Sequence, residues 1–203
     1  FLYCPNLENI TLPETITQIG DSAFYGCSKL NEIILPDDLT EIGDHAFRDC
    51  SELKSVHLPK NLENIGSYTF MHCYNLEEIK LPDSLTQIGD YTFAGCNITQ
   101  IKFPQNLKSI GEGTFHGCKK LESAIVPDST TQIGRWAFRS CTGLKSVVFP
   151  STVEQMGDGV FLDCSSLKDV TLPENLENIG SSYFSGCESL EKVTLSANIT
   201  SIG

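Results

Sequence analysis

Nine cysteines and four histidines are the side chains of this chain that could do chemistry. A deprotonated thiol is a nucleophile and a metal ligand, and two thiols can form a disulfide. The cysteines recur every 23 residues, with one interval of 22, so each occupies the same place in a repeated unit. They are Cys4, Cys27, Cys50, Cys73, Cys96, Cys118, Cys141, Cys164 and Cys187.

This spacing predicts a structural role for the thiols. No C-x-x-C pair or Cys/His ligand spacing occurs, and the count of nine is odd. Side chains stacked in one column run parallel, which is poor geometry for a disulfide. A free cysteine often serves as a small buried apolar residue, so we expect core thiols rather than disulfides, ligands or nucleophiles.

The histidines do not share one place in the repeated unit. His72 adjoins Cys73 and His116 lies near Cys118, which raises the hypothesis of a Cys/His metal site. No third ligand recurs beside them, so we predict surface histidines and no metal site. No phosphate-binding glycine loop, nucleophile elbow or carboxylate pair stands out, and we therefore predict no catalytic residues, no enzyme activity and no cofactor. The histidines are His45, His57, His72 and His116.

The repeated unit is L-x-x-I-x-L-P-x-x-L-x-x-I-G-x-x-A/T-F-x-x-C-x-x. In "LNEIILP", residues 30–36, apolar residues lie two apart, as Ile33 and Leu35 do, which predicts a short strand with one buried face. Pro36 ends that strand because it donates no ladder hydrogen bond. Leu39 and Ile42 then point inward from a loop, and Gly43 permits a tight turn or a close contact between coils.

The segment after each glycine suggests a short helix. Asp or Ser follows the glycine in most units, as Asp21 does, and these residue types cap helix N-termini. We expect a brief helix or 3₁₀ turn through "SAF", held in place by the phenylalanine. Gly26, Gly95, Gly117 and Gly186 fit a left-handed helix C-cap.

Together these elements predict an α/β solenoid of about nine 23-residue coils. No single unit can bury its Leu, Ile and Phe, but stacked units can. We expect a parallel β-sheet on one face and short helical or 3₁₀ turns on the opposite face. One residue is missing between Cys96 and Pro104. No linker is left over, so we expect a single solenoid domain over 1–203, monomeric and cut from a longer protein.

The unit resembles the BspA-like leucine-rich-repeat family, whose repeats carry a strand ending in L-P, then I-G, then A-F-x-G-C. The likeness covers essentially the whole chain. It implies that the sheet lies on the concave face of a leucine-rich-repeat superhelix, and that the chain is a noncatalytic binding module of a cell-surface or secreted protein. The implied partners are proteins, such as extracellular-matrix or plasma proteins, or other cells. The alternative is a structural spacer or scaffold that presents another domain.

In such a sheet, the side chains that face outward do not pack in the core, so the repeat does not fix their residue types. Lys80 and Lys102 should be neighbours, followed by Ile125 and Val148, which together could form a protein-binding patch. High β-propensity alone could also explain the Ile and Val. The candidate ligand-binding residues are His57, Glu78, Lys80, Gln100, Lys102, Ile125 and Val148.

Charge excludes some partners. The formal net charge of −12 argues against nucleic acid and anionic membranes, and no apolar run is long enough to span a bilayer. Residues 102–145 have seven Lys and Arg against three acidic residues, a local +4 that suits either an acidic partner, a sulfated glycan or scattered surface charge. Asn-Ile-Thr triplets at Asn9, Asn97 and Asn198 fit the glycosylation acceptor pattern, which matters only in a eukaryotic secretory setting.

Overall fold

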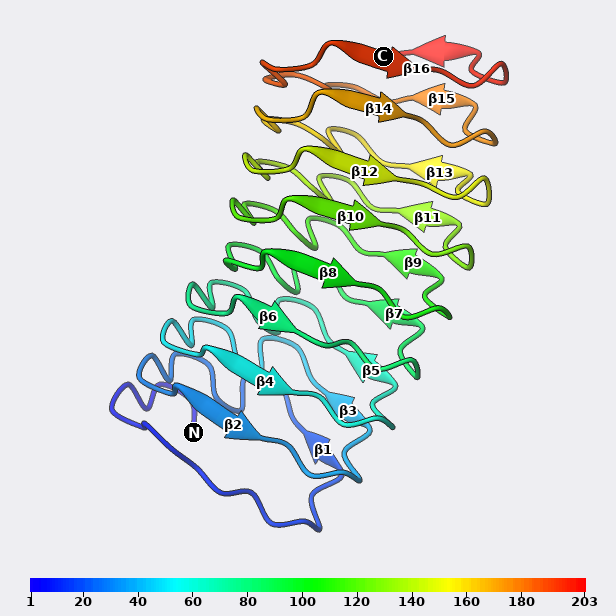
Figure 1. The fold of residues 1–203 in the computed structure, drawn as a ribbon. Coiled ribbons are helices and arrows are strands. Elements are labelled where there is room, and N and C mark those ends of the chain that lie inside the picture. The colour runs from blue at the N-terminus through cyan, green and yellow to red at the C-terminus, as the bar shows by residue number, and fades with distance from the viewer.

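The computed structural model describes residues 1–203 as a stack of coils built from short parallel strands, with the N-terminus at one end and the C-terminus at the other (Figure 1). Each full coil carries two strands, which form two columns along the stack. We call them the even column and the odd column. The even column consists of β2 (Glu32–Ile34), β4 (Ser55–His57), β6 (Glu78–Ile79), β8 (Gln100–Lys102), β10 (Ser123–Ile125), β12 (Ser146–Val148), β14 (Asp169–Thr171) and β16 (Lys192–Thr194).

The even column is the predicted sheet. Its strands pair in parallel with a shift of one repeat, as in Ile33 with Val56 and Ala124 with Val147. The ladder is interrupted between β6 and β8, where the missing residue shortens the coil, and between β12 and β14. The first repeat contributes no strand to this column, so the solenoid has about eight turns.

The odd column was not predicted, because a two-residue strand has no alternation to detect. In each of its strands the first residue faces outward, and in all but the last the second is buried. It includes the Ile column that the sequence assigned to a loop. Its strands are β1 (Gln18–Ile19), β3 (Glu41–Ile42), β5 (Asn64–Ile65), β7 (Gln87–Ile88), β9 (Ser109–Ile110), β11 (Gln132–Ile133), β13 (Gln155–Met156), β15 (Asn178–Ile179) and β17 (Ser201–Ile202).

The predicted helical or 3₁₀ turns are wrong, since the chain contains no helix. In a helix the backbone N–H groups bond within their own segment. Here Ser22, Phe24 and Gly26 instead donate to carbonyls of the next coil, at 2.8 Å each, while the residues between them close tight turns within the coil. This face is therefore a third inter-coil hydrogen-bond ladder, built from turns.

Left-handed backbone makes that ladder possible. All residues with positive φ fall in two positions of the repeat, represented by Ser22 (φ 55°) and Gly26 (φ 73°). A positive φ at the third residue is what a type II turn requires, and the turns Gly20–Ala23 and Phe24–Cys27 have it. The left-handed conformation predicted for Gly26 is confirmed, but no helix precedes it.

In five coils the Asp or Ser that follows the glycine also connects coils rather than capping a helix. Asp21 Oδ1 accepts a hydrogen bond from the backbone N–H of Asp44 at 2.8 Å, and Asp44 Oδ1 accepts one from Ser67 at 2.7 Å. Glycine precedes it because the coils touch there: a Cβ on Gly66 would lie 2.6 Å from the backbone nitrogen of Asp44. Glycine is required at this position because the coils are in close contact, and not because the backbone has a positive φ.

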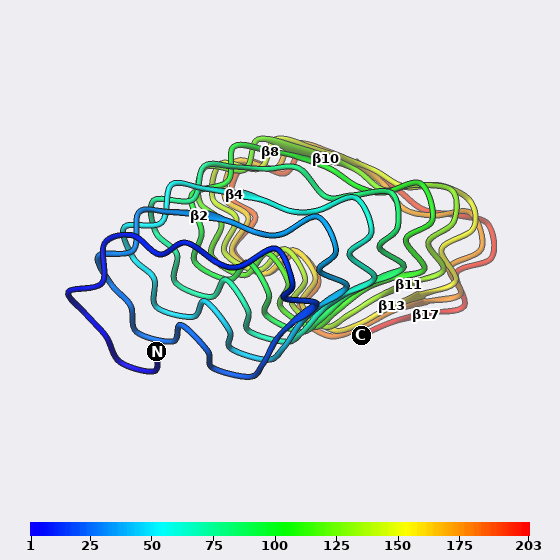
Figure 2. The ribbon, with the colours of Figure 1, turned by 90° about the horizontal axis from the view of Figure 1, so that it is seen from below.

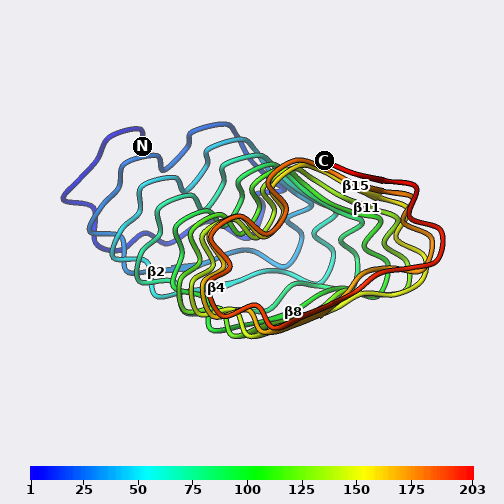
Figure 3. The same cartoon turned by 90° about the horizontal axis from the view of Figure 1, so that it is seen from above.

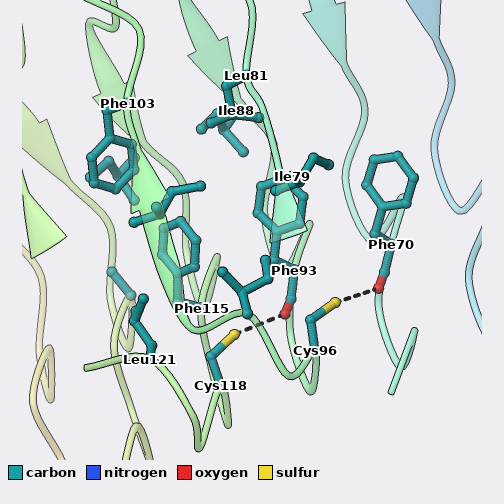
Figure 4. Packing of buried hydrophobic residues seen from close by; sticks show 14 of the residues in the cluster. Phe70, Ile79, Leu81, Ile88, Phe93, Cys96, Phe103, Phe115, Cys118 and Leu121 are labelled. Atoms are coloured by element: carbon teal, nitrogen blue, oxygen red, sulfur yellow. Dashed lines mark hydrogen bonds between the residues drawn. The ribbon is translucent and has the colours of Figure 1, made fainter. Parts of the chain in front are cut away.

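One continuous hydrophobic cluster runs through the stack, from Ile19 to Tyr183. The nine phenylalanines of the repeat form a row of stacked rings, with neighbouring centroids 5.2–6.0 Å apart. Figure 4 shows part of this row, Phe70, Phe93 and Phe115, beside the buried residues of both strand columns. Because the structure contains no helix, it also contains none that could span a membrane.

The coils are rotated relative to one another. Views along the stack from its two ends show each coil's outline turned slightly from that of the coil before it (Figures 2 and 3). The right-handed twist of β-strands produces such a rotation. Outward side chains of one column therefore follow a gently turning line along the stack.

Candidate functional site

The cysteines are core residues, as predicted. All nine are free thiols, and the seven from Cys27 to Cys164 are fully buried. From Cys27 onward each thiol donates a hydrogen bond to a phenylalanine carbonyl of the preceding coil, for example Cys96 to Phe70 and Cys118 to Phe93, both at 3.1 Å (Figure 4). Burial raises the pKa of Cys50 to about 12, which keeps the thiol in its protonated, unreactive form.

The histidines have separate local partners. The His45 ring stacks on Tyr68 with centroids 4.8 Å apart, and His72 Nδ1 lies 2.9 Å from Asp49 Oδ1. Burial and the nearby Arg139 guanidinium lower the pKa of His116. No group of three or more His, Cys, Asp and Glu side chains is arranged to hold a metal ion.

Sequence reasoning missed an aromatic stack on the turn face. His45, Tyr68 and Tyr91 share one position of the repeat, and their rings lie 4.8 and 5.2 Å apart. The 23-residue spacing of these three residues could have predicted the stack, because residues one repeat apart lie next to each other in neighbouring coils. Because the rings cover one another's faces, they leave mainly edges exposed and do not form a platform for a flat ligand.

The predicted binding residues lie on the even column. Its strands have the pattern exposed, buried, exposed, so two rows of side chains face outward. The flanking row contains the predicted Glu78 and Gln100 at the first strand position. The other, which we call the even row, consists of Ile34, His57, Lys80, Lys102, Ile125, Val148, Thr171 and Thr194.

Strand register brings the even row together. Lys102 pairs with Ile125, and Ile125 pairs with Val148. At the other end, Ile34 pairs with His57. Lys80 directly follows β6 and lies between His57 and Lys102, at the interruption of the ladder. The order predicted from the sequence is therefore the order in space.

The even row holds most of the apolar side chains that the interior repeats expose. Apart from the first and last repeats, the large apolar residues that are exposed are Ile34 (70%), Ile125 (68%), Val148 (56%) and Tyr74 (50%). The outward residues of the odd column are also in β-strands, yet all of them are Gln, Glu, Asn or Ser. Since β-propensity acts on both columns, it does not by itself account for the apolar residues of the even row.

Two shallow depressions lie along β4, β6 and β8. One, of about 590 Å³, is lined by both outward rows and includes Glu78, Lys80, Gln100 and Lys102. The other, of about 510 Å³, lies where the strands end and includes His57, Lys80 and Lys102. Five of the seven predicted residues thus line one or both of these depressions, which share Lys80 and Lys102. Ile125 and Val148 continue the row beyond them.

The basic region at 102–145 does not form one patch. Lys120 pairs with Glu77 at 2.7 Å, and Lys145 pairs with Glu122 at 3.1 Å. Arg135 and Arg139 both lie against the Trp136 ring. Of the basic residues in this stretch, only Lys102 belongs to the even row, so the interpretation as scattered surface charge is the better one.

Comparisons with known proteins agree with this architecture. The sequence profile of the BspA type leucine rich repeat region (6 copies) matches residues 1–122 and 86–203. A leucine-rich repeat protein from Bacteroides ovatus has a similar structure, with a TM-score of 0.68 and 28% identity over 99% of this chain and 70% of the other. No curated protein matches the sequence.

Two more distant structures share the fold. A leucine rich cell surface protein from Faecalibacterium prausnitzii has a TM-score of 0.53 and 24% identity over 91% of this chain and 78% of the other. A leucine-rich repeat protein from Eubacterium ventriosum has a TM-score of 0.52 and 22% identity over 90% of this chain and 58% of the other. With a repeat profile that spans every residue and a solenoid that repeats it coil by coil, the chain belongs to the BspA type leucine-rich repeat family.

Proposed function

We propose that this chain is a noncatalytic protein-binding module of a cell-surface or secreted protein and that the even row contacts the ligand. The observation that carries the proposal is the even row itself. It places exposed Ile125 and Val148 in line with Lys102 and, one coil further, Lys80, whereas the first, outward residue of every odd-column strand is polar. Apolar side chains flanked by charges on an otherwise polar surface are typical of protein interfaces.

The comparisons support a surface location. The Faecalibacterium prausnitzii protein that shares this fold is described as a leucine rich cell surface protein. Extracellular-matrix proteins, plasma proteins and other cells are the partners we propose to test first. No catalytic group is part of the proposal, because the buried thiols and the separately bonded histidines are used in packing.

A structural spacer or scaffold is the second candidate. The continuous hydrophobic cluster and the unbroken row of phenylalanine rings favour a stiff rod, which would hold another domain away from a surface. A spacer needs no ligand on its even row. The two candidates therefore differ in whether the even row binds anything.

The test is a binding assay of residues 1–203 against immobilised matrix proteins, plasma proteins and microbial cells. The variant Lys80→Ser/Lys102→Ser/Ile125→Ser/Val148→Ser removes the centre of the even row. We expect it to lose at least about tenfold in affinity, since a few residues near the centre of an interface carry most of the binding energy and a loss of about 1.4 kcal/mol is tenfold.

The matched control carries four serines at exposed positions of the odd column: Glu41→Ser/Gln87→Ser/Gln132→Ser/Gln155→Ser. It should bind as the unmodified chain does, and both variants should unfold at similar temperatures. Equal affinity of the two variants would reject the even row as the binding site. Absence of binding across the panel would favour the spacer.

A further inference from the structure

Lys80 and Lys102 form a cationic segment in the middle of the even row of an acidic chain. His57, Lys80 and Lys102 follow one another along the row, and Lys60 lines the depression beside them. The chain as a whole carries a formal charge of −12. None of the four ion pairs in the structure involves these lysines.

The acidic residues near this segment do not neutralise it directly. Asp37 and Asp83 line the same depression, but neither lies within ion-pairing distance of a lysine. Glu78 lies in the flanking row and also has no ion-pair partner. Two adjacent lysines without partners repel each other, and a bound carboxylate would relieve that repulsion.

Apolar residues lie on both sides of the two lysines, with His57 between Ile34 and Lys80. Ile34 precedes His57 across one strand pair, and Ile125 and Val148 follow Lys102 across the next two. The row therefore reads apolar, cationic, apolar along the stack. Neighbouring strands are about 4.8 Å apart, so Ile34 and Ile125 are separated by roughly 19 Å, a distance that about six extended residues cover.

We propose that the ligand of the even row is an acidic protein segment with aliphatic residues on both sides of its carboxylates. Aspartate or glutamate side chains contact Lys80 and Lys102, and the aliphatic side chains pack on Ile34 and on Ile125 with Val148. The inference rests on the proposed function and adds the chemistry of the partner. A sulfated glycan would supply the anions but not the aliphatic groups, so the apolar borders favour a protein.

A displayed library of random dodecapeptides tests the inference without a known partner. The chain is the target, and peptides that also bind the four-serine variant of the even row are removed. We expect enriched peptides with clustered Asp or Glu next to Ile, Leu or Val. Enrichment that depends on the even row but shows no excess of acidic residues would overturn the inference and keep the proposed function. No enrichment over the variant would count against both.

Defined probes test the lysines. A fluorescent peptide with two central glutamates and isoleucine on both sides should bind more weakly by at least about tenfold when Lys80→Glu/Lys102→Glu reverses the charge. The control Lys29→Glu/Lys119→Glu makes the same change in net charge at exposed lysines on the turns after cysteines, outside any ion pair. Its affinity should stay within about twofold of the unmodified chain, because those sites are not in the row.

Two further probes separate the ligand classes. The same peptide with glutamine in place of glutamate should bind at least about tenfold more weakly. Equal binding of the two peptides, or an equal loss in both lysine variants, would overturn the inference. So would heparin binding that Lys80→Glu/Lys102→Glu abolishes when the acidic peptide does not bind, since that result points to a sulfated glycan.

Discussion

The Cys96 thiol donates a hydrogen bond to the backbone oxygen of Phe70, 3.1 Å away and one coil earlier. The same oxygen accepts the backbone N–H of Cys73 at 3.1 Å. The repeated cysteine thus completes the hydrogen bonding of a buried carbonyl while filling core volume. This explains why a thiol, rather than a purely apolar side chain, recurs at that position.

Removal of this thiol should destabilise the fold. Cys96→Ala leaves a small cavity and removes one bond from the Phe70 carbonyl, so we expect a loss of about 1–3 kcal/mol in the free energy of unfolding. The half-buried Cys4, whose thiol makes no hydrogen bond in the structure, is the control, and Cys4→Ala should cost less than about 0.5 kcal/mol. Urea denaturation measures both, and equal losses would contradict the role assigned to the bond.

The buried thiols should also make stability depend on alkaline pH. Burial raises the pKa of Cys50 from the ordinary 9.0 to about 12. The unfolded chain therefore releases this proton first, and the stabilisation is complete below pH 9 and is lost as pH rises toward about 12. Cys50→Ala should have a shallower decline over this window, as measured by urea denaturation at several pH values. Parallel declines would show that other groups control alkaline unfolding.

The close contact between coils at the repeated glycine predicts that alanine destabilises the fold there, and a glycine without this contact provides the control. A Cβ at Gly66 would lie 2.6 Å from backbone atoms of Asp44 and Gly43, whereas a Cβ at Gly20 meets nothing within 4 Å. Gly66→Ala should therefore lose about 2–4 kcal/mol, because the coils must separate. Gly20→Ala should be neutral within about 0.5 kcal/mol. Thermal unfolding of the two variants checks this, and a similar shift in both would reject close packing as the reason for the glycine.

The left-handed positions predict a stabilising change. Ser140 has φ 56° at the repeat position where other coils carry Gly26, Gly95 and Gly117. Ser140→Gly should raise the free energy of unfolding by about 0.5 kcal/mol, since the relief of left-handed strain exceeds the added chain entropy. Ser166→Gly, at a position without positive φ, should lower it by about the same amount. Changes of the same sign in both variants would count against strain at Ser140.

The 23-residue period predicted the parallel strands and most of the core. Apolar residues at alternate positions in segments such as 30–36, Ile33 and Leu35, identified which side chains face inward, and the structure buries Leu30, Ile33 and Leu35. The same alternation placed Lys102, Ile125 and Val148 in one outward row. Position in a repeat is enough for these predictions because each coil copies the register of the one before it.

The turn face could not be predicted in the same way. Asp21 at a cap-like position suggested a helix, but its carboxylate bonds to the next coil, a contact that does not exist within one repeat. Left-handed φ at His45 and Asp49 has no local signature, since these residue types also occur in helices and loops. The strands of the odd column were not predicted because each is two residues long, which is too short to show an alternating pattern.

Methyl NMR of the chain mixed with the strongest binder from the protein and cell panel tests the central claim most directly. We predict that the methyl signals of the exposed Ile34, Ile125 and Val148 shift or broaden on binding, because the ligand covers them. The signals of Ile110 and Ile133, buried in the odd column, should keep their positions. Perturbation of other surfaces with the three even-row methyl groups unchanged would contradict the claim that the even row is the binding site.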